Sequence, residues 1–504
     1  MKTLKYFLSL CIVLLVASCK TNDTKVDVTL LQLNDVYEIS ALEGGKVGGM
    51  ARVKTVYNTL IKENPDTYIL MAGDFLNPSL LGTLKYQGER IGGKQMIEVM
   101  NALPTKLATF GNHEFDLKYP DLQKRLNEST FDWVSANAKH KVNDSINLFY
   151  KVQNNQKTPL SETYVLDINQ KNKEFKIGFL SLTIDSNKKD YVDYEDKFTS
   201  AERVYKGLKS QSDIVLGFTH LTKKNDREFL KLFPEIPLVM GGHEHTNMLL
   251  TEGTSHIAKA DANAKSVYVH RLQFDTKTKK TTITSTLVYL DSTVVQNPEI
   301  LKIVNKWQAI QDAQLKGVIK NPEAVVYRTQ MPLDGRDTPI RSVQTNLGKI
   351  IAQSMFVASK IPADCAFVNG GSIRIDDALS GDITGIDIFR VLPFGGSVYE
   401  IDIKGTLLKQ VLDYGKNAAG TGAYLQRYNA NFENGEWFVN GKKIVADKTY
   451  HIALSDFLMK GFDIPMLKPS NPLVLNIYKP IETDTTDIRA DIRKTVISFL
   501  KTIK

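Results

Sequence analysis

Short apolar runs alternate with helical patterns along the first half of the chain. Runs of about four to eight apolar residues are typical of strands, and apolar positions recurring about every three to four residues are typical of helices. The alternation predicts strands at 28–33, 68–71, 106–110, 131–136, 175–182, 213–218 and 236–240, and helices at 50–61, 95–101 and 119–127. This order of elements predicts a layered α/β domain.

The pattern changes twice further along the chain. Apolar and polar residues alternate strictly over 266–291 around a polar turn at 275–280, which predicts a β-hairpin that ends the first domain. A helical pattern at 299–316 then predicts a rigid connector. From about residue 322 a second α/β pattern begins, with expected helices at 347–357 and 386–392 and strands at 365–368, 398–403 and 450–454. We therefore expect domains at 20–297 and 322–504, joined by a linker helix within 298–321.

The first 19 residues have the pattern of an export signal. Lys2 and Lys5 precede an apolar stretch at 6–16, and small residues lead up to Cys19. No later apolar run reaches the roughly 18 residues that a membrane span needs. The segment Leu-Val-Ala-Ser-Cys resembles a bacterial lipobox, which implies cleavage before Cys19 and attachment of lipid to its thiol. We expect an exported protein, anchored to a bacterial membrane and facing the periplasm or the cell surface.

The composition of the chain limits the kinds of molecule that it is expected to bind. The chain has 504 residues, 24% of them charged, and a net charge of +8 without a dense block of Lys and Arg. A nucleic-acid polymer is therefore not an expected partner, whereas a small anionic substrate is compatible with the charge. Of the three cysteines, only Cys365 would remain free in the mature chain, so no internal disulfide is expected. The oligomeric state is left open by the sequence.

Candidate metal ligands follow the predicted strands of the first domain with unusual regularity. Taken singly, an Asp at such a place is more often a helix cap, and a His is more often a buried, hydrogen-bonded side chain. Here, however, four of the eight histidines of the chain fall at strand ends, among these residues: Asp35, Asp74, Asn112, His113, His220, His243 and His245. Ions such as Mn, Fe, Co and Zn accept carboxylate, amide and imidazole ligands together. The set is larger than one ion needs, so it predicts a two-metal site.

This ordered set resembles the calcineurin-like metallophosphoesterases, and together with the C-terminal half the chain is similar to the 5'-nucleotidase family. The resemblance implies a four-layer αββα sandwich joined by a helix to a second α/β domain, which binds the substrate. It implies two divalent ions, Zn, Mn or Co, and their ligands: Asp35, Asp74 and His245 for the first, and Asp74, Asn112, His220 and His243 for the second. It also implies that His113, oriented by Asp116, faces the phosphate as a catalytic pair.

One position departs from the family pattern. The family motif Asn-Asp-x-His reads Asn34-Asp35-Val36-Tyr37 here, so a tyrosine stands where a histidine ligand is expected. A phenol ionises only near a pKa of ~10 and is a weak ligand when neutral. Glu38 would point to the opposite face of a continuing strand, so it is not an obvious substitute. We therefore expect an altered or weaker first metal site.

The C-terminal half contains candidate substrate-binding residues. Alone, an arginine here would more often form a surface ion pair, and a phenylalanine would more often be core. The resemblance implies that Arg341, Asn369 and Arg374 contact the phosphate end of a nucleotide, where guanidinium groups donate bidentate hydrogen bonds. It further implies that Phe394 and Phe457 clamp the base and that Asp463 contacts the ribose.

The sequence therefore predicts hydrolysis of nucleoside 5'-monophosphates to nucleoside and phosphate at a dinuclear metal centre. Two alternatives within the enzymes remain open, namely hydrolysis of UDP-sugars and of 2',3'-cyclic nucleotides. An alternative from another class is a nucleotide-binding lipoprotein without catalytic activity, which Tyr37 motivates. Against it stands the joint presence of a nearly complete ligand set and the His113–Asp116 pair.

Overall fold

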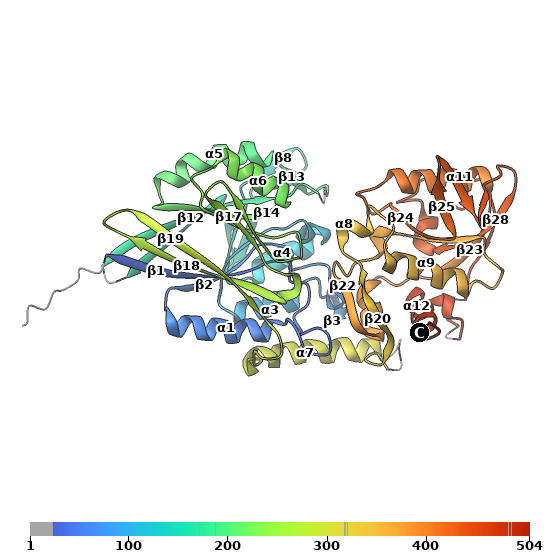
Figure 1. Cartoon of the computed structure of the whole chain (residues 1–504), viewed down its shortest axis with the longest axis horizontal. Coiled ribbons are helices and arrows are strands. Elements are labelled where there is room, and N and C mark those ends of the chain that lie inside the picture. Colours follow the sequence, from blue (N-terminus) through green and yellow to red (C-terminus); the bar gives the residue numbers. More distant parts are fainter. Residues whose placement is uncertain are drawn as a thin grey trace, which may run out of the picture.

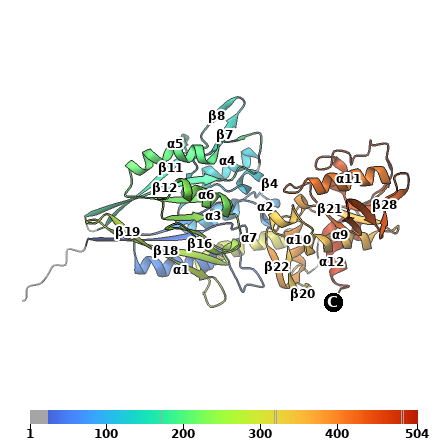
Figure 2. The same ribbon diagram turned by 45° about the horizontal axis from the view of Figure 1, so that its top comes forward.

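The computed structural model describes residues 24–503, apart from 171, 187, 317, 318, 320, 482 and 485. The expected signal peptide and Cys19 lie outside the described residues. Within the described ranges, none of the helices combines the length and the apolar character that crossing a membrane requires. The chain forms two α/β halves that lie beside each other, and both views show the C-terminal half against one end of the N-terminal half (Figure 1, Figure 2).

The N-terminal half contains two six-stranded sheets. The first has the order β19 (Lys280–Tyr289), β18 (Ser266–Asp275), β1 (Lys25–Leu33), β2 (Thr67–Met71), β5 (Thr105–Thr109) and β6 (Asp132–Val134). The second has the order β11 (Thr163–Gln170), β12 (Lys173–Thr183), β14 (Ile214–His220), β15 (Leu238–Gly241), β17 (Ser255–Lys259) and β16 (Met248–Glu252). The neighbours β1, β2, β5 and β6 run parallel, as do β12, β14, β15 and β17.

These two sheets pack face to face, with helices on both outer faces. One apolar core holds side chains from both sheets, including Leu30, Leu70, Phe179 and Leu216. Outside the first sheet lie α1 (Met50–Glu63), α3 (Lys94–Ala102), α4 (Tyr119–Glu128) and α7 (Pro298–Leu315), and outside the second lie α5 (Lys197–Ser210) and α6 (Lys223–Leu232). The structure therefore confirms the αββα sandwich.

The predicted connector is a helix, but it is also part of the first core. Helix α7 matches the expected span at 299–316 closely, and it packs against α1 and α3. Trp307 is fully buried there, and its Nε1 donates a hydrogen bond to Glu98 at 2.9 Å. In Figure 1 the helix runs along the lower side of the N-terminal half toward β20.

The C-terminal half is built on one five-stranded sheet. Its order is β24 (Leu425–Tyr428), β21 (Cys365–Asn369), β28 (Thr449–Ser455), β23 (Val398–Lys404) and β29 (Val474–Tyr478). One face is covered by α9 (Asn346–Ala358), α10 (Gly385–Val391) and α12 (Ile492–Leu500), and the other by α11 (Gly405–Asn417). A two-stranded sheet of β20 (Val325–Asp334) and β22 (Ala378–Thr384) lies on the side of the N-terminal half (Figure 1).

The sequence patterns did not assign α5, α6, α11, α12, the strands β11, β16, β17, β24 and β29, or the small sheets. Helix α6, for example, is very polar and buries only a narrow stripe around Phe229 and Leu230, so it contains few apolar residues by which to recognise it. The strands of the small sheets are short: β7 (Ala138–Val142), β8 (Ser145–Asn147) and β13 (Val192–Tyr194); β9 (Tyr150–Gln153) and β10 (Gln156–Pro159); and β25 (Ala430–Glu433), β26 (Glu436–Val439) and β27 (Lys442–Lys443).

Candidate active site

The expected metal ligands converge at the carboxyl ends of the parallel strands. The first sheet contributes the residues that follow β1, β2 and β5, and the second contributes the end of β14 and the loop after β15. Because the sheets face each other, their strand ends meet at one edge. All the side chains concerned are buried or half-buried: Asp35, Asp74, Asn112, His220, His243 and His245.

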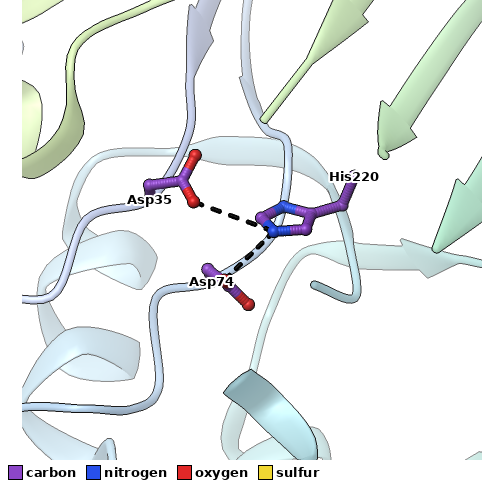
Figure 3. Close-up of side chains that lie close together, drawn as sticks. All are labelled: Asp35, Asp74 and His220. Carbon is purple, nitrogen blue, oxygen red and sulfur yellow. Dashed lines mark ion pairs between the residues drawn. The ribbon is translucent and has the colours of Figure 1, made fainter. Parts of the chain in front are cut away.

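Asp35, Asp74 and His220 form the centre of this group (Figure 3). The Nε2 atom of His220 lies 3.0 Å from Asp74 Oδ2 and 3.7 Å from Asp35 Oδ1, and the ligand atoms of the three residues lie within 4.8 Å of one another. The other ring nitrogen, Nδ1, donates to the carbonyl of Ala72 at 2.7 Å. Among the described residues, Nε2 has no hydrogen-bond partner of suitable geometry. The imidazole therefore turns Nε2 toward two carboxylates, and an ion placed between them would find the donor set of a metal site.

The electrostatics of the group also fit cations. Burial lowers the pKa of His220, but the carboxylates of Asp74 and Asp35 outweigh it and raise that pKa to about 9. Burial and the charge of His220 lower the pKa of His243 to about 3. The buried carboxylates therefore require positive charge beside them, which protons or divalent ions can supply. The residues present thus fit the metal ions that the fold implies.

The backbone after these strands allows the loops that carry the expected ligands to lie very close together. Asp35, Asp74 and His245 have φ angles of 54°, 55° and 56°, a region that side chains with a Cβ seldom adopt. A Cβ at Gly111 would overlap the carboxylate of Asp74, and one at Gly73 would lie 2.6 Å from the His220 ring. The glycines therefore allow the ligands to stand this close together.

His113 and Asp116 form the expected pair beside the ligands. His113 Nδ1 lies 2.8 Å from Asp116 Oδ2, and the same carboxylate accepts hydrogen bonds from Asn77 and from Arg374 of the C-terminal half. Burial opposes charge on His113, but Asp74 and Asp116 raise its pKa to about 9. The raised pKa favours the protonated imidazole, a form that can stabilise negative charge.

Glu114, for which the sequence suggested no role, holds the two loops together. Its buried carboxylate accepts backbone hydrogen bonds from Asp74 at 2.9 Å, Phe75 at 2.8 Å, Leu76 at 3.0 Å and Gly111 at 2.7 Å. Burial and the charge of Asp74 raise the pKa of Glu114 to about 7, against the effect of these donors. The only signal in the sequence is its place between the expected ligand Asn112 and Asp116.

A second positioning residue, Lys259, lies under the loop of the two histidines after β15. Its fully buried ammonium is 2.8 Å from Asp226 and also contacts Glu244, which stands between His243 and His245. It donates to the carbonyl of Gly242 at 2.7 Å. Sequence reasoning missed Lys259, although a lysine that ends an apolar strand is a recognisable signal.

Tyr37 lies inside the group, and the C-terminal half supplies a partner for it. The Tyr37 hydroxyl donates to Asp376 Oδ2 at 3.0 Å and lies 2.9 Å from His245 Nε2. Asp376, only 4% exposed, was not among the expected site residues, although it follows Arg374 by two positions. Glu38 pairs with Arg390 at 3.1 Å and, as expected, does not replace the missing histidine.

The expected substrate-binding residues are only partly brought together. Asn369 donates to Asp463 at 2.7 Å, and Arg341 pairs with Asp337 at 2.8 Å. Phe394 is 60% exposed. Phe457 lies 6.2 Å from the ring of Phe462, which sequence reasoning had not included. Between Phe394 and Phe457 there is no ring contact in the part of the chain that the structure describes. The proposed roles of these residues remain predictions.

Comparisons with known proteins agree with this geometry. Residues 28–247 match the family model of the calcineurin-like phosphoesterases, and residues 325–469 match that of the 5'-nucleotidase C-terminal domain. The trifunctional nucleotide phosphoesterase protein YfkN of Bacillus subtilis (strain 168) is 26% identical over 494 residues, which cover 87% of this chain and 32% of that longer protein. The 5'-nucleotidase of Homo sapiens is 25% identical over 504 residues, covering 87% of this chain and 83% of the human protein.

A solved structure has the same fold across both halves. The 5'-nucleotidase precursor from Thermus thermophilus superimposes with a TM-score of 0.68 at 20% identity, covering 95% of this chain and 96% of that one. With the two matching family models, the strand-end ligand group and this architecture, the chain is a calcineurin-like phosphoesterase domain joined to a 5'-nucleotidase C-terminal domain, which is the composition of a metal-dependent phosphohydrolase.

Proposed function

We propose that this chain hydrolyses nucleoside 5'-monophosphates to nucleoside and phosphate with the help of two divalent metal ions. The supporting observation is the joint placement of the Asp35, Asp74 and His220 cluster beside the His113–Asp116 pair, which Arg374 of the C-terminal half contacts. Similarity to the human 5'-nucleotidase supports the choice of substrate class.

The strand-end ligands would hold the ions in two sets that share Asp74. The first set would be Asp35, Asp74 and His245, and the second Asp74, Asn112, His220 and His243. Such ions supply positive charge for phosphoryl oxygens and lower the pKa of a water molecule. Carboxylate, amide and imidazole ligands suit Zn, Mn and Co.

The other residues would bind the nucleotide and stabilise charge. Arg374 and Arg341 would orient the phosphate, because guanidinium groups match phosphate oxygens geometrically. Protonated His113 would stabilise the charge that develops on the phosphoryl group, and Asp116 would keep the imidazole in place. Phe394 and Phe457 would stack on the base, while Asp463 and Asn369 would contact the ribose side and the phosphate side, respectively.

The test compares substrates and removes the metals. Residues 20–504 with Mn, Co or Zn are expected to release phosphate from AMP, and the release should stop with a chelator and fall at least about 100-fold in Asp74→Asn. Parallel assays with UDP-glucose and a 2',3'-cyclic nucleotide identify the preferred class. Release that survives both the chelator and the substitution would overturn the metal-dependent proposal.

We further propose that the protein is exported and anchored by lipid on Cys19, with domains at 20–297 and 322–504 joined by the linker at 298–321. The small residues before Cys19 support this location. In a bacterial host, Cys19→Ala is expected to move the protein from the membrane fraction to the soluble fraction. An unchanged distribution would contradict the lipid anchor.

A further inference from the structure

Asp376 is a carboxylate of the C-terminal half that enters the ligand group of the N-terminal half. It lies in the chain between Arg374 and β22. In Figure 2, β22 is on the side of the C-terminal half that faces the other half. Its Oδ2 atom is 3.0 Å from His245 Nε2 and 3.6 Å from His113 Nε2. A buried carboxylate this close to an expected ligand atom needs an explanation, because removing a charge from water is unfavourable.

The contacts of Tyr37 show which part of the group Asp376 joins. The Tyr37 hydroxyl lies 2.9 Å from His245 Nε2, 3.4 Å from Asp74 Oδ2 and 3.5 Å from Asp35 Oδ1, which are the atoms expected to hold the first ion. The same hydroxyl lies 3.0 Å from Asp376 Oδ2. Around the Tyr37 hydroxyl, where the family pattern expects a histidine, the Asp376 oxygen is thus a fourth carboxylate or imidazole atom, beside those of Asp35, Asp74 and His245.

The backbone fixes Asp376 in this orientation. Its φ angle is 45°, the same uncommon region that Asp35, Asp74 and His245 occupy. The backbone N–H of Asp337 donates to Asp376 Oδ1 at 2.6 Å, and His245 Nδ1 lies 2.6 Å from the Asp376 carbonyl oxygen. One carboxylate oxygen is thus held by the C-terminal half, and the other is turned toward the ligands.

The chemistry of the two candidates favours the carboxylate. A phenol becomes a good ligand only after it loses its proton, which in an unperturbed side chain happens near a pKa of ~10. A carboxylate is a good ligand for Mn, Co and Zn. The Asp376 Oδ2 atom lies 3.0 Å from His245 Nε2 and 3.0 Å from the Tyr37 hydroxyl, so it is placed where such a ligand would be needed.

We propose that Asp376 is a ligand of the first metal ion, supplied by the C-terminal half in place of the histidine that Tyr37 replaces. The inference rests on the proposed function, because it takes the two-metal centre as given. It adds that the first site is complete only when the two halves are in contact. Binding of the first ion therefore stabilises the arrangement in which the two halves are in contact. Separation of the halves in turn weakens the binding of that ion.

Metal binding tests this role without an activity assay. Residues 20–504 are titrated with Mn²⁺ by calorimetry, and the bound ions are counted by elemental analysis and by the spin-coupled Mn signal in electron paramagnetic resonance. The wild type is expected to bind two coupled ions. In Asp376→Asn, the Mn²⁺ affinity of one site should fall at least about tenfold. The signal of two coupled ions should then be replaced by that of isolated Mn²⁺. The control is Asp382→Asn, which removes an exposed ion pair with Arg328 within the C-terminal half and should keep both ions.

A rescue separates ligation from damage to the fold. Adding Tyr37→His to Asp376→Asn restores a ligand from the N-terminal half, so the second coupled ion should return. Two tightly bound, coupled ions in Asp376→Asn, with the wild type also binding two, would overturn this inference alone. Unchanged Mn²⁺ binding together with tighter phosphate binding in Asp376→Asn would identify Asp376 as a competitor of the substrate and would also overturn it. A wild type that binds fewer than two ions would overturn the two-metal centre itself.

Discussion

Single buried side chains around the ligands determine where the ligands stand. Glu114 joins the loop after β2 to the loop after β5, and Lys259 supports the loop after β15. Neither is an expected metal ligand, but each satisfies several backbone groups that burial would otherwise leave unpaired. At the scale of the residue, the site therefore depends on ionisable groups that are not themselves expected ligands.

Glu114→Gln tests this dependence. The amide keeps the size of the side chain but replaces one accepting oxygen with an NH₂ group that faces backbone donors. We expect the free energy of unfolding to fall by about 2–5 kcal/mol, measured by urea denaturation in chelator so that metal binding does not contribute. Glu89→Gln, at an exposed pair with Lys124, is the matched control and should have little effect. Equal effects of the two substitutions would contradict the positioning role.

His270 makes stability depend on pH away from the ligands. It is fully buried between Gln32 and Ser285, and burial lowers its pKa from 6.5 to about 3. Above pH 6.5 it is neutral in both the folded and the unfolded state. Below pH 6.5 only the unfolded chain takes up the proton, so folding stability is lost as the pH falls, by up to about 1.4 kcal/mol per pH unit.

The measurement compares the wild type with His270→Gln in chelator at about pH 7 and about pH 5.5. The wild type should lose about 1 kcal/mol more free energy of unfolding over this interval than the variant. The variant can be less stable at both pH values because of altered packing, so the difference between the two pH values is the relevant quantity. The same loss in both proteins would exclude His270 as the cause.

At the scale of the element, glycines just after the strands allow the loops of the two sheets to pack close together at the site. Gly73 and Gly111 follow β2 and β5, where the ligand loops pass within van der Waals distance of each other. The strands themselves are ordinary buried parallel strands, which hold the loops rigidly but carry apolar side chains. The side chains expected to bind metal lie at or just after the ends of the strands.

Gly111→Ala should disrupt the arrangement of the expected ligands. The added Cβ would overlap the Asp74 carboxylate, so Asp74 must move and the shared ligand position is lost. We expect phosphate release from AMP to fall at least about 100-fold and Mn²⁺ binding to weaken, as measured by steady-state assay and calorimetry.

The matched control is Gly207→Ala on the exposed side of α5, where a Cβ meets open space. Alanine favours a helix over glycine by up to about 1 kcal/mol, so this variant should be active and slightly more stable. If both alanine variants kept full activity, the close approach of Gly111 to Asp74 would not matter for the site.

At the scale of the whole molecule, the two halves meet at the site. Arg374 contacts Asp116, Lys265 pairs with Asp377 at 2.6 Å, and Arg390 pairs with Glu38 at 3.1 Å. These contacts close the C-terminal half over His113 and the expected ligands, which are buried or half-buried. We therefore expect that the halves must separate before the proposed nucleotide substrate can reach the site, and again before the product can leave.

Joining the halves should stop turnover. Cysteines introduced at Lys265 and Asp377 can be linked by a short reagent that bonds two thiols through disulfides, and the native Cys365 is buried and protected from it. Linked protein is expected to lose at least about 90% of its multiple-turnover rate with AMP, and a reducing agent should restore it. The unlinked double variant serves as the control. Linked protein that turns over at the full rate would rule out opening at this contact.

The sequence by itself determined the layered α/β halves, the helix between them, and the polar side chains that follow the strands and are the expected metal ligands. These features are local, because periodicity and strand-end polarity are set by neighbouring residues. Only the tertiary structure decided the surroundings of Tyr37. Its neighbour Asp376 is more than 300 positions away in the sequence and on the other half of the molecule, so no local pattern could connect them. For the same reason, the functions of Glu114 and Lys259 became visible only once the loops that they hold were placed in space.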